Sequence, residues 1–246
     1  EAGAGGRGRG FAADRGRGGV VPRRSGGAGP ARAAGRAGPP GGGAAGLADG
    51  AGAAIAAFEA ALGTSHPLVA YPLESLADAL VDLRRGDEAV PLRERALALR
   101  IAAVGEESPE VASALARFAH LQRRRGAFAA AIELDRRAIA IYDRHPHPTA
   151  ATALIGLGLS LLEVKRPAEA REPVERALAL RLGDEPRALA AAQYALAKAL
   201  WESGEDRPRA LELARAARDT YREVRSLPSD AADLAKVEAW LAGRGG

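Results

Sequence analysis

The sequence contains no cysteine, no methionine, and only three lysines among its 35 basic residues. The absence of cysteine excludes disulfides and thiolate metal sites. No stretch of about 18 apolar residues occurs. The chain also lacks the charged start, apolar segment and small-residue cleavage site of a secretory signal. We therefore expect a cytoplasmic protein without a membrane span.

Glycine and arginine gather at the start of the chain. Residues 1–50 hold 18 of the 30 glycines, four prolines and eight arginines, with almost no large apolar side chains. Such a segment buries too little surface to offset the entropy lost on ordering, so we predict a disordered tail. Its eight arginines against Glu1, Asp14 and Asp49 give a net charge of +5, and the whole chain carries +4, which leaves −1 for residues 51–246. The predicted folded part therefore has no general basic surface to favour nucleic acid.

The rest of the chain contains an internal repeat. The segment that begins at His66 recurs from Ser108, an offset of 42 residues, so that Leu73 aligns with Leu115. A third copy follows at an offset of 39, and a fourth, looser copy comes after it. A fixed period of this length is typical of stacked structural units that each bury a face against the next.

Within each copy, apolar residues follow helical spacing. A first stripe stands at i, i+3, i+4 and i+7, and a short break separates it from a second stripe. In the first copy these stripes are Leu73, Leu76, Ala77 and Leu80, then Ala89, Leu92, Ala96 and Leu99. Each copy is thus predicted to be a helical hairpin whose open apolar face is covered by the next hairpin.

We therefore predict an all-α fold, a right-handed superhelical solenoid of antiparallel helix pairs. The predicted divisions are a disordered tail at 1–50, an array at 51–225 and a C-terminal capping helix at 226–242. Within the array we expect a half repeat at 51–63 and full repeats near 66–107, 108–146, 147–184 and 185–225. Ser229 is the expected N-cap of the last helix, with Asp230 and Asp233 in its first turn, where negative charge suits the helix dipole.

The repeat resembles the tetratricopeptide repeat, in particular the long form of kinesin light chains. In the third copy the matching residues are Leu154, Leu157, Gly158 and Leu161 with Ala170, Val174 and Ala177. The sequence departs from the family pattern at Arg93 and Asp135, where a large apolar residue is usual, and at Gln122 and Gln193. The segment LAKALWESGEDRPRALELARAAR also resembles the C-terminal repeat region of bacterial serine/threonine kinases of the myxobacterial type.

Residues suited to catalysis are few. Of the four histidines, His66, His145 and His147 fall in His-Pro turns, and no carboxylate stands at metal-ligand spacing from the last two. No Gly-rich phosphate loop follows a strand pattern, and the lysine, His-Arg-Asp and Asp-Phe-Gly motifs of kinases are absent. We expect no catalytic residue, no metal and no cofactor, and hence not an enzyme.

The resemblance implies a protein-interaction scaffold, the regulatory part of a larger signalling protein. In tetratricopeptide arrays the first helices of successive hairpins line a concave surface along which a peptide or a partner helix lies. By the family's register, the residues on this surface are Tyr71, Glu74, Asp78, Asp82, Ser113, His120, Arg123, Arg124, Thr152, Ile155, Leu159, Glu163, Tyr194, Lys198, Trp201 and Glu202. Alternatively, they form the solvated faces of ordinary helices.

Two aromatic residues are the expected anchors of this surface. Exposed aromatics often dominate binding energy, so Tyr194 and Trp201 are better candidates than the charged residues. Their replacement by Ala should weaken partner binding more than replacement of Arg123 and Arg124, whose solvated charges act mainly on rate and salt dependence. The alternative for Trp201 is packing beneath the loop at 203–207.

A second functional hypothesis rests on the tail. The segment GGRGRGF at 5–11 has the composition of arginine–glycine segments that bind RNA by charge and stacking. Phe11 is the only aromatic among the first fifty residues, whereas an RNA-binding tail interleaves more of them. RNA binding through the tail is therefore the alternative to a protein-binding scaffold.

The array begins with half a hairpin. Ala54, Ile55, Phe58 and Leu62 form an apolar stripe proper to a second helix, but residues 25–42 are too rich in glycine and proline to supply its first helix. We expect this helix to be ordered only by packing on the next hairpin, with its other side bare, which invites self-association.

Overall fold

The structure is a computed structural model that describes residues 43–180, 182, 185–224 and 228–245. Most of the predicted tail, including the segment at 5–11, lies outside the described residues. Within the described ranges there are ten α-helices and one short 3-10 helix, and no strand. The all-α prediction is therefore confirmed.

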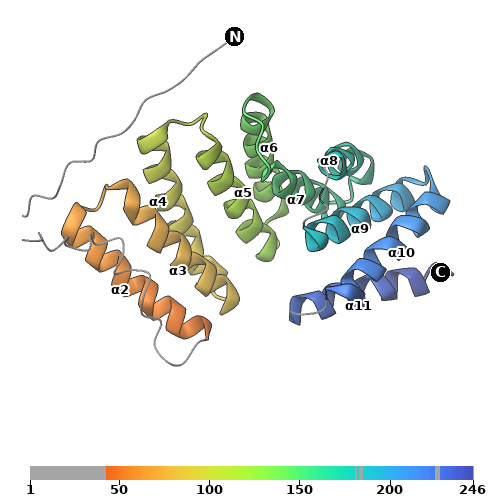
Figure 1. Cartoon of the computed structure of the whole chain (residues 1–246), viewed down its shortest axis with the longest axis horizontal. Helices are drawn as coiled ribbons and strands as arrows, with labels where there is room; N and C mark the ends of the chain where they lie inside the picture. The colour runs from red at the N-terminus through yellow and green to blue at the C-terminus, as the bar shows by residue number, and fades with distance from the viewer. Residues whose placement is uncertain (1–42, 181, 183–184, 225–227, 246) are drawn as a thin grey trace, which may run out of the picture. The chain divides into compact units, whose positions relative to one another are not determined.

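The helices pair as the repeat predicts. In chain order they are α2 (Ala44–Leu62), η1 (Pro67–Val69), α3 (Ala70–Asp82), α4 (Gly86–Val104), α5 (Pro109–Arg124), α6 (Phe128–Arg144), α7 (Ala150–Glu163), α8 (Pro167–Ala179), α9 (Pro186–Ser203), α10 (Arg207–Glu223) and α11 (Pro228–Ala242). Each α-helix contacts the next, so that α3–α4, α5–α6, α7–α8 and α9–α10 are four stacked antiparallel hairpins (Figure 1). This arrangement is the predicted right-handed solenoid of helix pairs.

The turn inside each hairpin repeats one backbone conformation. Arg84, Gly126, Lys165 and Gly204 stand at equivalent positions, and their φ angles are 61°, 76°, 61° and 77°. Glycine adopts this left-handed region freely, whereas a residue with a Cβ loses about 1 kcal/mol there. The geometry of the repeat therefore overrides the local preference of Arg84 and Lys165.

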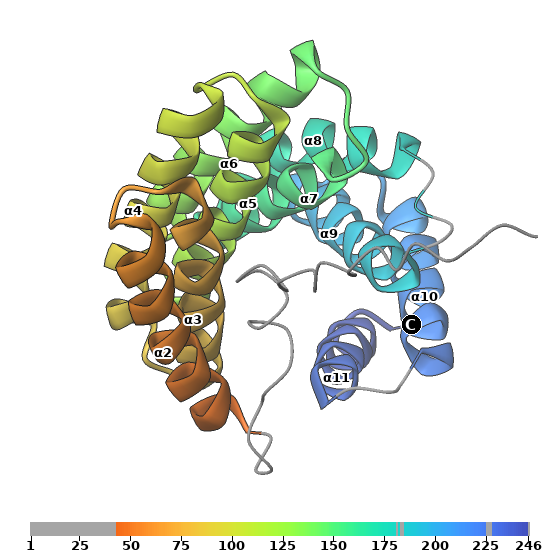
Figure 2. The same ribbon diagram turned by 60° about the vertical axis from the view of Figure 1, so that its left-hand side comes forward.

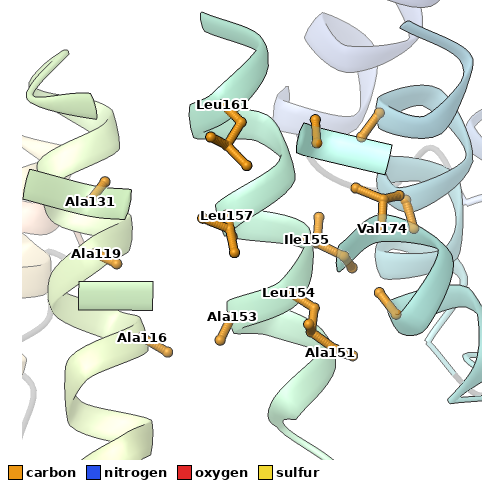
Figure 3. Packing of buried hydrophobic residues seen from close by; sticks show 14 of the residues in the cluster. Ala116, Ala119, Ala131, Ala151, Ala153, Leu154, Ile155, Leu157, Leu161 and Val174 are labelled. Atoms are coloured by element: carbon orange, nitrogen blue, oxygen red, sulfur yellow. The ribbon is translucent and has the colours of Figure 1, made fainter. Parts of the chain in front are cut away.

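Small residues allow the helices to approach closely. Three positions of each copy are small and buried: Ala77, Ala89 and Ala96; Ala119, Ala131 and Ala138; Gly158, Ala170 and Ala177; and Ala197, Ala210 and Ala217. At Gly158 an added Cβ would lie 2.2 Å from Cγ2 of Val174, so the bulk of Val174 takes the place of the missing side chain. Figure 3 shows α7 between the helix that carries Ala116 and Ala119 and the helix that carries Val174.

Three of the first helices, α5, α7 and α9, lie closer to one another than the second helices do. α5 contacts α7, and α7 contacts α9, whereas among the described residues α4, α6, α8 and α10 make no comparable contacts with one another. The stack therefore bends with its first helices on the inner side (Figure 2). We call the side of α3, α5, α7 and α9 that carries Asp78, His120, Leu159 and Lys198 the inner face.

The helix before the first hairpin is longer than predicted. α2 begins at Ala44, so residues 44–50 are helical and do not belong to a tail. Ala51 is buried, and Ile55 and Phe58 pack against the cluster of Val69, Ala70, Leu73, Ala96 and Leu99. Leu47 is 63% exposed. Among the described residues, α2 thus keeps an exposed apolar side chain at Leu47, and the self-association that a bare side would invite stays a prediction.

Helix α2 must be compared with the prediction that the chain has no membrane span. By length and composition, α2 is apolar enough to cross a membrane. It carries Asp49 and Glu59, and Arg95 of α4 lies 2.6 Å from the Glu59 carboxylate. In the structure α2 packs along α3 as the second helix of a hairpin would.

Asp230, predicted to favour the dipole of the capping helix, forms an ion pair with Arg187 of α9. α11 begins at Pro228, which places Ser229 inside the helix and not at its N-cap. Asp230 is buried, and Nε of Arg187 on α9 donates to its Oδ1 at 2.8 Å. The carboxylate of Asp230 therefore anchors α11 to the fourth hairpin.

Candidate interaction surface

Each first helix contributes equivalent positions to the inner face. One row is Asp78, His120, Leu159 and Lys198, and a second row, at the C-terminal ends of the helices, is Asp82, Arg124, Glu163 and Glu202. Across neighbouring helices, Nζ of Lys198 lies 3.6 Å from Oε1 of Glu163. The structure thus brings predicted residues from α7 and α9 together on one side of the stack.

The sixteen predicted residues differ in exposure. Eight are exposed: Tyr71, Asp78, Asp82, His120, Arg124, Thr152, Glu163 and Glu202. Six are half-buried: Ser113, Arg123, Leu159, Tyr194, Lys198 and Trp201. Glu74 and Ile155 are buried. Half of the predicted set is therefore directly open to a partner.

Glu74 holds the first hairpin together and is not an open surface residue. Its carboxylate accepts hydrogen bonds from Nε and Nη2 of Arg100 on α4 at 2.7 and 2.9 Å. These bonds raise the pKa of Arg100 above its usual value. The same guanidinium lies 4.9 Å from the centre of the Tyr71 ring. Tyr71, which is 57% exposed, is therefore an aromatic side chain held in place from below.

The expectation that Arg123 is a solvated charge is wrong. Its Nη1 donates to Oδ2 of Asp135 at 2.6 Å, and Asp135 is fully buried. A Cβ at Gly156 on α7 would lie 2.4 Å from that Nη1, so the guanidinium occupies the space of a missing side chain in the next hairpin. Burial lowers the pKa of Arg123 and raises the pKa of Asp135 to about 7, although Arg123 itself acts to lower the latter.

The two charged departures from the repeat pattern are compensated inside the protein. Arg93 and Asp135 stand at equivalent positions of α4 and α6, and both are buried. Nη2 of Arg93 donates to Oδ1 of Asp78 on α3, much as Arg123 pairs with Asp135. A charge at a normally apolar position requires an opposite charge on a neighbouring helix. That requirement is the signal by which the sequence could have revealed both pairs.

The middle of the inner face is positively charged. His120 is exposed, yet its pKa is lowered first by burial among neighbouring protein atoms and then by the charges of Arg123 and Arg124. The His120 ring is therefore open to solvent on one side, while neighbouring protein atoms on its other sides exclude water and disfavour its charged form. Arg124 is exposed and makes no ion pair within the described part of the chain. The α5 section of the face therefore presents an uncompensated positive charge.

Tyr194 and Trp201 are not exposed anchors, because the capping helix covers them. The ring of Trp240 on α11 meets Tyr194 and Trp201 edge to face, with centroid distances of 6.1 and 5.6 Å. Burial raises the pKa of Tyr194 to about 12. Arg207 and Arg244 lie over the Trp201 ring at 5.2 and 5.3 Å. Packing of Trp201 near the loop at 203–207, the alternative from the sequence, is closer to what the structure shows.

The remaining predicted residues give the face a less charged section. The Ser113 hydroxyl lies 3.0 Å from the Tyr142 hydroxyl, at the edge of the face near the turn that follows α6. Thr152 is exposed, Leu159 is half-buried, and Ile155 packs inside. In the residues that the structure describes, no three His, Asp or Glu side chains gather as metal ligands. Spread-out exposed side chains of this kind suit binding along a surface.

Comparison with known proteins agrees with this geometry. The family model described as Tetratricopeptide repeat matches residues 68–144, which span the first two hairpins. The match is to the tetratricopeptide repeat. No curated protein is similar enough in sequence to match the chain. The resemblance to kinase repeat regions stays a prediction.

Solved structures show the same tetratricopeptide-like fold over most of the chain. The TPR-like repeats of a kinesin light chain from Podosopora anserina share 22% identity at a TM-score of 0.58, covering 73% of this chain and 88% of that one. BtubC (BKLC) from P. vanneervenii shares 19% identity at a TM-score of 0.64, and the match covers 81% of this chain and 82% of that one. MamA shares 19% identity at a TM-score of 0.52, and the match covers 71% of this chain and 91% of that one. Identities this low establish the fold alone, and tetratricopeptide-like folds generally mediate protein–protein interactions.

Proposed function

We propose that this protein is a cytoplasmic interaction scaffold that binds an extended peptide or a partner helix along its inner face. The observation that carries the proposal is a contrast between the first helices and the second helices of the hairpins. Neighbouring second helices are tied by ion pairs: Arg136 to Glu169 at 3.7 Å, Arg209 to Glu175 at 3.3 Å, and Arg176 to Asp143. On the inner face, exposed side chains recur at equivalent positions of successive first helices, and Asp82, Arg124 and Glu202 make no ion pair with any described residue.

Individual inner-face residues support this role in different ways. Tyr71 is the better anchor now that Tyr194 and Trp201 are covered, because Arg100 fixes its ring and leaves 57% of the residue exposed. A preorganised aromatic loses little entropy on binding, which favours affinity. Thr152 and Leu159 offer an uncharged section on α7. The resemblance of residues 196–218 to kinase repeat regions fits a docking role within a larger signalling protein.

Site-specific photocrosslinking tests the proposal. A photoreactive amino acid would replace Thr152 on the inner face or Ala140, an exposed small residue of α6, in the full chain expressed in its native source. We expect one defined protein to crosslink at Thr152 and not at Ala140, and mass spectrometry would identify it. Equal crosslinking at both positions, or crosslinking at Ala140 alone, would refute the inner face as the binding surface.

A further inference from the structure

The C-terminal ends of the first helices carry charges that the helix dipole disfavours. Asp82 and Glu163 are the last residues of α3 and α7, and Glu202 lies in the last turn of α9. None of these three last turns contains a basic residue. The negative end of a helix favours cations, so an acidic side chain there is unfavourable. The same local conflict in three of four equivalent helices is what a functional surface produces.

Only part of this charge is neutralised within the protein. Glu163 lies near Lys198, at 3.6 Å. Asp82, Arg124 and Glu202 are exposed and make no ion pair with any described residue. Along the stack, the uncompensated charges are therefore negative on α3, positive on α5 and negative on α9.

We infer that the occupant of the inner face is an extended peptide segment in which one acidic residue lies between two basic residues. The acidic residue pairs with Arg124, and the basic residues pair with Asp82 and Glu202. This inference rests on the proposed function and adds the chemistry of the partner. A nucleic acid backbone or a purely acidic peptide does not fit, because Asp82 and Glu202 repel a uniformly negative chain.

Helix spacing sets the spacing of charges in the peptide. Packed helices such as α5, α7 and α9 lie about 10 Å apart, and we take a similar distance from α3 to α5. An extended chain rises about 3.3 Å per residue. Contacts with neighbouring first helices are therefore about three peptide residues apart. Because α9 is two helices beyond α5, the acidic residue stands about three residues from one basic residue and about six from the other.

Fluorescence anisotropy with designed peptides tests the inference. The labelled probes are Lys-x-x-Glu-x-x-x-x-x-Lys, the same pattern in the opposite order, and their charge-inverted forms with Glu for Lys and Lys for Glu, where x is Gly or Ser. With the full chain at about 10 mM salt, we expect one of the first two peptides to bind at least about fivefold more tightly than its inverted form.

Charge-reversed variants of the protein assign the effect to the inner face. The triple variant Asp82→Lys, Arg124→Glu, Glu202→Lys should reverse the peptide preference. The control Glu94→Lys, Arg137→Glu, Glu212→Lys makes the same charge changes at exposed positions of second helices and should leave the preference unchanged.

Three outcomes overturn the inference: equal affinity for a peptide and its inverted form, an equal shift in the control variant, or no binding of any probe at about 1 mM. None of these bears on crosslinking at Thr152, so the proposed function is judged separately. Reversal in the inner-face variant alone supports the charge pattern.

Discussion

Replacing Arg123 by Leu is expected to lower the free energy of unfolding by about 3 kcal/mol near about pH 9, because it leaves a buried carboxylate without its cation. Asp135 is completely inaccessible, and the Arg123 side chain is only 13% exposed, so solvent screens the pair little. Among the described residues, Oδ1 of Asp135 has no hydrogen-bond partner. No second group is therefore in place to take over from Arg123.

The double variant Arg123→Leu/Asp135→Val should recover most of this loss. Leu and Val are the residues that the protein itself uses at the equivalent positions of the third hairpin, Leu162 and Val174, and both of these are buried. Replacing a buried ion pair by packed apolar residues is commonly neutral or stabilising by about 1–4 kcal/mol. We expect the double variant to lie within about 1 kcal/mol of the wild type.

The loss in the single variant should depend on pH. Burial raises the pKa of Asp135 to about 7 against the lowering effect of Arg123, so removing Arg123 raises that pKa further. A carboxyl whose pKa is higher in the folded protein stabilises the fold below its unfolded pKa of about 3.9, and this contribution is lost as pH rises through the folded pKa. The difference in unfolding free energy between Arg123→Leu and the wild type should therefore be small near about pH 5. It should widen by about 1.4 kcal/mol for each pH unit above about 7, to about 3 kcal/mol near about pH 9.

Urea unfolding followed by far-ultraviolet circular dichroism at the two pH values measures all three proteins. If the single and double variants lose the same stability near about pH 9, or if the loss in the single variant is independent of pH, Asp135 is not held ionised by Arg123. Either result would refute the argument that charge compensation explains the departures from the repeat.

Three further predictions concern packing and the anchor. Gly158→Ala should cost about 1–3 kcal/mol in urea unfolding, because its Cβ would lie 2.2 Å from Cγ2 of Val174, and adding Val174→Ala should restore stability. The control Gly52→Ala, with nothing within 4 Å of the new Cβ, should instead gain up to about 1 kcal/mol. Trp240→Ala should lower the melting temperature and shift the emission of the remaining tryptophan to longer wavelength; an unshifted spectrum would contradict the packing of the cap. Tyr71→Ala should weaken binding of the crosslinked partner in calorimetry by about 1–2 kcal/mol with little loss of stability, and unchanged affinity would exclude Tyr71 as an anchor.

The features that the sequence predicted are those that recur in every copy. The small residues at Ala77, Ala89 and Ala96 repeat at offsets of 42 and 39, so both the hairpins and their stacking follow from the period. The same register predicted surface positions at Thr152 and Glu163, and both residues are exposed. A packing requirement that recurs in every repeat can be recognised in a single sequence, because the same residue pattern occurs four times in the chain.

The features that the sequence missed depend on contacts that occur once. Arg123 pairs with Asp135 only in the second hairpin, and the residues equivalent to Arg123 in the other copies, Val81, Leu162 and Trp201, are apolar. Trp201 is covered because α11 follows the fourth hairpin where another first helix would otherwise pack. The start of α2 was missed because Gly46 and Gly50 suggested a tail, although the alanines between residues 44 and 56 favour a helix.

Blocking the inner face directly tests whether the partner lies there. Thr152→Trp adds a bulky side chain to the exposed inner surface of α7, and Ala140→Trp adds the same side chain to an exposed position of the second helix α6. Calorimetric titration of the crosslinked partner into the full chain should show at least about a tenfold loss of affinity for Thr152→Trp and no change for Ala140→Trp. Wild-type affinity in Thr152→Trp, with loss only in Ala140→Trp, would contradict binding along the inner face.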